Sequence, residues 1–210
     1  MGKELNTNYA KTSSHLISVI FHPAFLPVYG LLIIFFAPTL MMYIPFQAKK
    51  VIFLLAFINM TVVPVALLPL LRYRNIITSY SLESREERII PMGIGCMMYI
   101  ITTIILYSYQ IPGLVKTFTL AAAITSLVLL LITFKWKISI HSAGMGGLLA
   151  TVISLSLRMS AGLVYLWVTI LLISGLIMSA RLYMNSHNPS QVYIGFVVGF
   201  TTFLIVMMIS

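Results

Sequence analysis

The sequence consists largely of apolar stretches long enough to cross a lipid bilayer, separated by short polar breaks. A helix needs about 20 mostly apolar residues to cross the hydrocarbon core, and only helices and closed barrels satisfy their backbone hydrogen bonds in lipid. The stretches are continuously apolar and lack the two-residue alternation of a barrel strand, so they predict helices. Only 8% of the 210 residues are charged, against about 25% in soluble domains. The sequence therefore predicts an all-α, polytopic transmembrane helical bundle.

Seven apolar stretches are candidate spans, and we expect them to form a single membrane domain over residues 1–210. The stretches cover residues 16–38, 51–71, 92–110, 117–134, 143–158, 162–182 and 190–209. The first is interrupted by His22-Pro23 and by Pro27, which favours a kinked or partly re-entrant segment. Pro64 and Pro69 are expected to bend the second stretch. We therefore expect six to seven spans.

Acidic residues are few, which limits the chemistry open to the chain. The sequence has no Asp, and its four acids are Glu4, Glu83, Glu86 and Glu87. Enzymes that handle diphosphates through Mg²⁺ need several converging carboxylates, because Mg²⁺ prefers hard oxygen ligands. Three of the four acids share one five-residue window, which disfavours two opposed carboxylate motifs. The single Cys96 excludes a disulfide framework. We expect no metal, no cofactor and no nucleic-acid partner.

The connections between the stretches place the polar clusters on one side of the membrane. If all seven stretches cross, their connections alternate between two faces. Face A then holds the N-terminus and the links 72–91, 135–141 and 181–191, whereas face B holds the links near Lys49, Lys116 and Arg158. The links of face B have the composition of plain turns between helices. Candidate functional residues therefore gather on face A.

The link 72–91 contains the first polar cluster. Ser84 and Glu87 have the spacing of a capping box, which predicts a helix start. Arg85 and Arg88 are three residues apart and would share one side of that helix. Arginines next to a membrane also serve as anchors to lipid headgroups, and this cluster alone favours that interpretation.

The link 135–141 leads to the second cluster. His141 stands at the mouth of the fifth stretch, directly before Ser142, which we interpret as the residue that caps the helix. Three glycines follow, at positions 144, 146 and 147, and allow close approach of a neighbouring helix or of a bound anion. A single histidine at such a position is more often structural than catalytic.

The third cluster lies between the last two stretches. Asn188-Pro189 is typical of an N-cap followed by the first helical residue, and Gln191 is placed to return a hydrogen bond to the cap. His187 then lies just outside a helix N-terminus, where free N–H groups and the helix dipole favour an anion. Arg181, near the end of the preceding stretch, is placed to face the same point. Arg and His at membrane depth indicate a functional site.

Together the clusters suit phosphoryl transfer through a covalent phosphohistidine. One histidine attacks phosphorus, cations and backbone N–H groups hold the oxygens, and a second histidine protonates the leaving oxygen. A basic pocket that binds a lipid headgroup without chemistry uses the same residues and remains the alternative. A structural scaffold with merely interfacial polar residues is a third reading.

In these clusters the sequence resembles the type 2 phosphatidic acid phosphatase (PAP2) superfamily over about residues 80–200. The family motifs are Lys-x6-Arg-Pro, Pro-Ser-Gly-His and Ser-Arg-x5-His-x3-Asp. The third is matched by Arg181, five residues, His187, three residues and Gln191. The second is partly matched by Ser139-Ile140-His141. The first is poorly matched by Arg85, Arg88 and Pro91, whose spacing differs.

The resemblance implies a role for each matched residue. His187 would be the nucleophile, and His141 would be the general acid for the leaving group. Arg181 would bind phosphate, either Arg85 or Arg88 would replace the cations of the first motif, and Ser139 and Ser142 would complete the phosphate site. Gln191 stands where the family has a carboxylate that orients the nucleophile; an amide fixes the tautomer but stabilises the imidazolium less.

The implied function is a metal-independent membrane phosphatase that hydrolyses a lipid phosphate or a polyprenyl (di)phosphate. The alternative is a related membrane protein that binds or transports lipid phosphate without turnover. We expect membrane lipids as partners and a bacterial inner (plasma) membrane as the location. Face A carries nine Lys and Arg against four on face B, which favours a cytoplasmic face A, whereas the family pattern implies the outer side.

Overall fold

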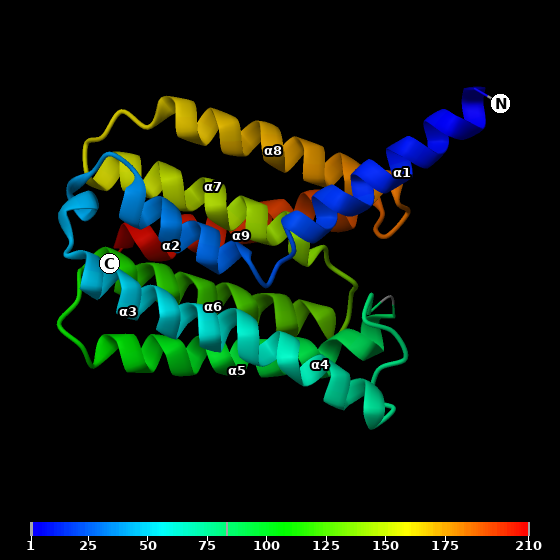
Figure 1. Cartoon of the computed structure of the whole chain (residues 1–210), viewed down its shortest axis with the longest axis horizontal. Coiled ribbons are helices and arrows are strands. Elements are labelled where there is room, and N and C mark those ends of the chain that lie inside the picture. Colours follow the sequence, from blue (N-terminus) through cyan, green and yellow to red (C-terminus); the bar gives the residue numbers. More distant parts are fainter. Residues whose placement is uncertain (1, 83, 210) are drawn as a thin grey trace.

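The chain forms a bundle of long helices, as the computed structural model describes for residues 2–82 and 84–209 (Figure 1). No strand occurs within these ranges. The helices are α1 (Gly2–Ile20), α2 (Leu26–Phe36), α3 (Phe46–Phe57), α4 (Val63–Tyr73), α5 (Arg85–Tyr107), α6 (Gly113–Thr133), α7 (Ile140–Arg158), α8 (Val164–Tyr183) and α9 (Pro189–Ile209). A 3-10 turn (Leu40–Tyr43) precedes α3, and a π-turn (Ile58–Val62) joins α3 to α4.

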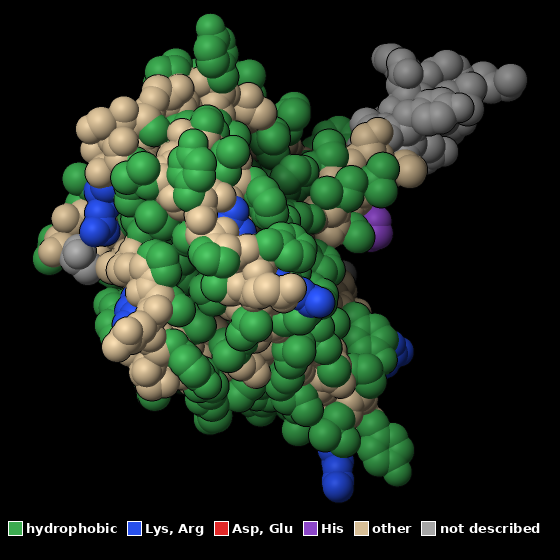
Figure 2. Space-filling model, turned by 60° about the vertical axis from the view of Figure 1, so that its left-hand side comes forward, with side chains coloured by type: hydrophobic (Ala, Val, Ile, Leu, Met, Phe, Trp, Pro, Cys, Tyr) green, Lys and Arg blue, Asp and Glu red, His purple; other side chains and the backbone are tan. Residues whose placement is uncertain are grey.

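Six of the predicted spans are helices long and apolar enough to cross a membrane. They are Phe46–Tyr73, Arg85–Tyr107, Gly113–Thr133, Ile140–Arg158, Val164–Tyr183 and Pro189–Ile209. Hydrophobic side chains cover most of the surface seen in Figure 2, as expected of a protein whose outer face meets lipid. The prediction of an all-α bundle with six to seven spans is therefore confirmed.

The first predicted stretch, 16–38, is two helices rather than one span. α1 ends at Ile20 and α2 begins at Leu26, around the His22-Pro23 break. The 11 residues of α2 cover only about 16 Å at ~1.5 Å per residue, short of the ~30 Å hydrocarbon core. In Figure 1, α1 continues away from the bundle toward the N-terminus.

α2 ends close to face B, so the link before it lies part-way along the bundle, where His22 and Phe25 are exposed at its surface. The buried amino group of Lys49 donates hydrogen bonds to the carbonyls of Phe35 (2.9 Å) and Met42 (2.8 Å), which satisfies the end of α2. At the other end, the Thr61 hydroxyl donates to the Ala24 carbonyl. Since α2 is short, residues 21–25 are placed at membrane depth among the other helices.

The π-turn bends the second span before Pro64. Pro64 has no N–H, so it cannot close an α-helical bond to Met60, and the wider turn accommodates this gap. α4 then continues through Pro69 to Tyr73. The α-helical pattern is therefore interrupted just before Pro64, whereas Pro69 lies inside an uninterrupted helix.

α7 and α9 pack with their backbones in contact. A Cβ added at Gly195 would lie 2.6 Å from the Ser139 carbonyl oxygen, and one at Gly199 would overlap the Ala143 carbonyl. Gly146 faces the backbone of α9 in the same way. Small residues at such an interface let helices approach closely in lipid. The glycines of the second cluster therefore serve helix packing, and they bring the face A ends of α7 and α9 together.

Candidate functional site

The polar clusters of face A meet around one cavity of about 250 Å³. Its histidines and arginines come from the link before α2, from the face A ends of α5, α7 and α8, and from the link just before α9. These side chains are His22, Arg88, His141, Arg181 and His187. Most of the other lining residues are apolar and extend between the helices toward face B. No Asp or Glu occurs among the described residues that line the cavity. The arrangement is a cationic pocket that continues into an apolar shaft.

His187 is held by the start of α9. The Gln191 N–H donates to the Asn188 side-chain oxygen (2.9 Å), and the Asn188 N–H donates to Gln191 Oε1 (3.3 Å), which forms the predicted capping box. Gln191 Oε1 also lies 2.9 Å from His187 Nδ1. Since this oxygen can only accept, His187 Nδ1 must carry the proton. The Nε2 lone pair of the neutral imidazole is therefore free for an electrophile or a donor.

Arg88 occupies the Nε2 side of His187. Its Nη1 lies 3.4 Å from His187 Nε2 and donates to the Ile138 carbonyl (3.5 Å), while its Nε donates to the Leu82 carbonyl (2.7 Å). Burial, the largest cause, and the positive charges of Arg88 and Arg181 together lower the pKa of His187 to about 3, against the opposing effect of the hydrogen bond to Gln191. His187 is 7% exposed. It is therefore a neutral imidazole over the whole physiological pH range.

His141 lines the cavity from the start of α7. Its Nε2 is 3.2 Å from the Ser18 carbonyl oxygen, which can only accept a hydrogen bond, so Nε2 carries the proton. Nδ1 is then the ring nitrogen that can accept a proton from a group in the cavity. His141 and His187 thus line the same cavity with different ring nitrogens available.

His22 is a cavity residue that sequence reasoning missed. Its ring packs edge to face with that of His141, with centroids 5.7 Å apart. The Ala24 N–H donates to His22 Nδ1 (3.3 Å), so Nε2 carries the proton of the neutral ring. The available signal was a histidine at a break in an apolar stretch.

Arg181 has a buried polar atom that is left unsatisfied. It lines the cavity from the end of α8, and its buried Nε has no hydrogen-bond partner. A buried guanidinium N–H without a partner is costly, and so is a buried cation, Arg88, beside the partly buried Arg181 when no carboxylate of the described residues lines the same cavity. Arg181 and Arg88 together therefore favour an anion in the polar end of the cavity.

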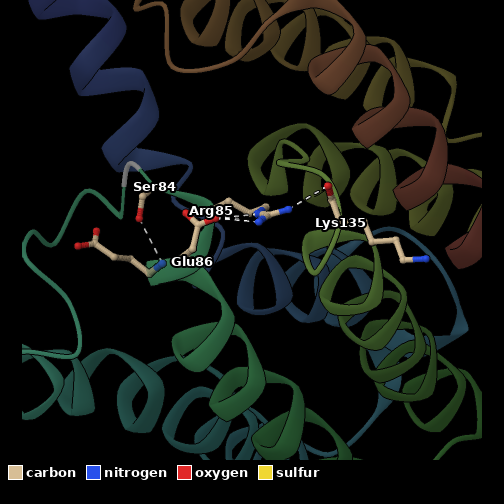
Figure 3. Close-up of polar contacts among 5 residues, drawn as sticks. Ser84, Arg85, Glu86 and Lys135 are labelled. Atoms are coloured by element: carbon tan, nitrogen blue, oxygen red, sulfur yellow. Dashed lines mark hydrogen bonds and ion pairs between the residues drawn. The ribbon is translucent and has the colours of Figure 1, made fainter.

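Arg85 and Arg88 lie in different surroundings although they are three residues apart on one helix. Ser84 caps α5 as predicted, accepting a hydrogen bond from the Glu87 N–H. From there Arg85 turns outward, pairs with Glu86 at 2.8 Å and donates to the Lys135 carbonyl (3.1 Å), as Figure 3 shows. Arg85 does not line the cavity, whereas Arg88 does.

Ser139 and Ser142 are placed differently from the prediction. Ser139, not Ser142, is the N-cap of α7, so the predicted cap was wrong by one helical turn. The cap lies earlier because the Ser139 N–H donates to the Gln191 carbonyl (3.2 Å), which fixes the backbone just before α7. The two hydroxyls are fully buried, lie 2.9 Å apart and do not line the cavity. They support the wall of the pocket rather than contact its contents.

The two acids whose side chains the structure describes, Glu86 and Glu87, lie outside the pocket. Glu87 accepts hydrogen bonds from the Thr78 N–H (2.9 Å) and hydroxyl (2.6 Å), and Glu86 pairs with Arg85. Glu83 and the side chain of Glu4 lie outside the described residues. Within the described part of the chain, no three His, Cys, Asp or Glu side chains group in a way that suits a metal ion.

No protein family model, no curated protein and no solved structure matches the chain.

Proposed function

We propose that the chain is a metal-independent membrane phosphatase of the PAP2 type, acting on a lipid phosphate in a bacterial plasma membrane. The observation that carries the proposal is the neutral His187, whose proton is fixed on Nδ1, in a cavity with two arginines and no carboxylate among its described lining residues. A phosphate group matches the cationic end of the cavity, and its apolar chain matches the shaft. Imidazole nucleophiles of this kind form covalent intermediates with phosphorus.

The residues divide the reaction into two displacements. In the first, the monoanionic phosphate ester gives its proton to His141 Nδ1, His187 Nε2 attacks phosphorus, the phosphorus–oxygen ester bond breaks, and the leaving oxygen takes that proton from His141. In the second, His141 Nδ1 takes a proton from water, whose oxygen attacks phosphorus; the phosphorus–nitrogen bond breaks and inorganic phosphate leaves with that proton. Arg88 and Arg181 hold the phosphoryl oxygens in both steps. Gln191 keeps the proton on Nδ1 throughout.

Phosphate release from a panel of lipid phosphates and a polyprenyl phosphate, without added divalent metal, tests the proposal. We expect release by the wild type and a loss of at least 10²-fold, the usual scale of acid–base contributions, in His187→Ala and His141→Ala. His15→Ala changes an exposed histidine outside the cavity and should retain activity. Full activity in both cavity variants would overturn the proposal.

The two arginines of α5 provide a matched pair for the phosphate site. Arg88→Met removes a cation from the cavity and should raise KM and lower kcat, because a phosphoryl contact is lost. Arg85→Met removes a cation that pairs outside the cavity and should leave both constants near the wild-type values. Equal effects of the two changes would contradict the placement of phosphate.

A protein that binds lipid phosphate without turnover is the second candidate, and Gln191 is the observation that favours it. An amide beside His187 stabilises the imidazolium less than a carboxylate does. In that case the purified protein binds anionic lipid through Arg88 and Arg181 but releases no phosphate from any member of the panel.

A further inference from the structure

The apolar end of the cavity has a defined floor. Four lining residues from four elements form it: Met60, Tyr99, Phe118 and Phe203. Each lies about 14 residues from the face A end of its helix, which corresponds to a depth of about 20 Å at ~1.5 Å per residue. The shaft therefore ends inside the bundle rather than passing through it.

The two phenylalanines are fixed in place. Their rings pack edge to face with centroids 5.7 Å apart, and both side chains are buried. Glycines stand behind them: a Cβ at Gly147 would lie 2.8 Å from the Phe203 ring, and one at Gly30 would overlap the Phe118 ring. With backbone directly behind each ring, neither ring can retreat to lengthen the shaft.

The shaft is also narrow. A cavity of about 250 Å³ lies below the usual range of roughly 300–1,000 Å³ for small-molecule sites, and here it extends over a depth of about 20 Å. Ala122 lines it one helical turn nearer to face A than Phe118. So small a volume over that depth leaves room for one chain.

We propose that the site takes single-chain lipid phosphates and that the Phe118–Phe203 pair sets the longest chain that fits with its phosphate at His187. This inference rests on the proposed function for the identity of the headgroup. It adds the substrate class: a phosphate on one alkyl or prenyl chain, in preference to a phosphate on a two-chain glycerolipid. Phe118 and Phe203 are then residues that determine specificity, remote from the reacting atoms.

The test measures binding of alkyl phosphonates of increasing chain length, at a fixed mole fraction in one detergent. Phosphonates carry a carbon–phosphorus bond and are not hydrolysed by phosphoester cleavage, so binding is read independently of turnover. Each methylene buried in the shaft should lower Kd about fourfold, from ~0.8 kcal/mol per CH₂. The affinity should stop rising at one chain length, where the chain end reaches Phe118. A two-chain phosphonate should bind more weakly than the best single chain.

Variants at the floor should change the chain length at which the affinity stops rising, which we call the break point. Phe118→Ala should shift it to longer chains, and Phe118→Leu, which keeps more of the packing, should shift it in the same direction by less. Ala122→Leu should shift it to shorter chains because the new side chain fills the shaft. Phe200→Ala is the matched control, since Phe200 stacks on Phe196 and does not line the cavity.

The outcomes separate this inference from the proposed function. An unchanged break point in Phe118→Leu and Ala122→Leu, no break point at all, or equal binding of one-chain and two-chain phosphonates would overturn the inference. If break points move as expected but the chain-matched alkyl phosphates release no phosphate, the chain-length limit stands and the proposed catalysis fails.

Discussion

Replacement of Gln191 by Glu should increase phosphate release by this protein. Glu keeps the side-chain length, so a carboxylate oxygen takes the place of Oε1, 2.9 Å from His187 Nδ1 and 3.3 Å from the Asn188 nitrogen. When His187 is phosphorylated on Nε2, the ring becomes positively charged. A carboxylate about 4 Å from the centre of that charge stabilises it by about 4 kcal/mol at an effective dielectric constant of ~20. That energy corresponds to about 10³-fold in rate at ~1.36 kcal/mol per factor of ten.

The same change should weaken phosphate binding. A negative charge at position 191 opposes the anion that Arg88 and Arg181 attract, so we expect KM to rise while kcat increases. Steady-state phosphate release from one lipid phosphate, with kcat and KM determined separately, measures both effects. Gln191→Leu is the control: it removes the acceptor of His187 Nδ1–H and should lower kcat. A kcat for Gln191→Glu at or below that of the wild type would refute the role of residue 191 as the partner of the nucleophile.

Two further predictions concern pH and stability. Because folding lowers the pKa of His187 from 6.5 to about 3, the unfolded chain binds the proton more readily between these values, and stability is lost as pH falls through that window. ¹⁵N NMR of the His187 imidazole should show a neutral ring with its proton on Nδ1 well below pH 6. Arg88→Met should raise the midpoint of the His187 titration. A wild-type titration midpoint near 6.5 would contradict the burial of this site. The Thr125 hydroxyl is buried without a partner, whereas the Thr133 hydroxyl donates to the Leu129 carbonyl at 2.7 Å. In thermal unfolding, Thr125→Val should therefore leave the free energy of unfolding unchanged or raise it, whereas Thr133→Val should lower it by about 1 kcal/mol. A larger loss of stability in Thr125→Val than in Thr133→Val would show that the Thr125 hydroxyl makes a hydrogen bond in the folded protein.

Local signals predicted the features that local interactions determine. The six spans follow from apolar stretches of sufficient length, and the starts of α5 and α9 follow from capping sequences at Ser84 and Asn188. In each case the residues that decide the structure lie within a few positions of one another. The break at His22-Pro23 was predicted for the same reason.

Tertiary contacts decided what the sequence left open or misplaced. Arg85 and Arg88 lie on neighbouring sides of one helix, and only the packing of α5 turns Arg88 toward the cavity. Ser139 caps α7 because its N–H meets the Gln191 carbonyl of α9, more than 50 residues away in the chain. His22 contacts His141 because α2 is short, so that residues 21–25 before it lie part-way along the bundle. Only His22 has a signal in the sequence around it, as a histidine at a break in an apolar stretch; the other two contacts have none.

Trapping of a phosphoryl group on His187 tests the central claim most directly. The wild type is mixed with a lipid phosphate, quenched with base, which preserves phosphohistidine, and its peptides are analysed by mass spectrometry. A phosphoryl group on the peptide that contains His187, absent from His187→Ala and formed without added metal, is the predicted result. Steady turnover of the lipid phosphate with no phosphoryl group on His187, or undiminished turnover by His187→Ala, would contradict the account.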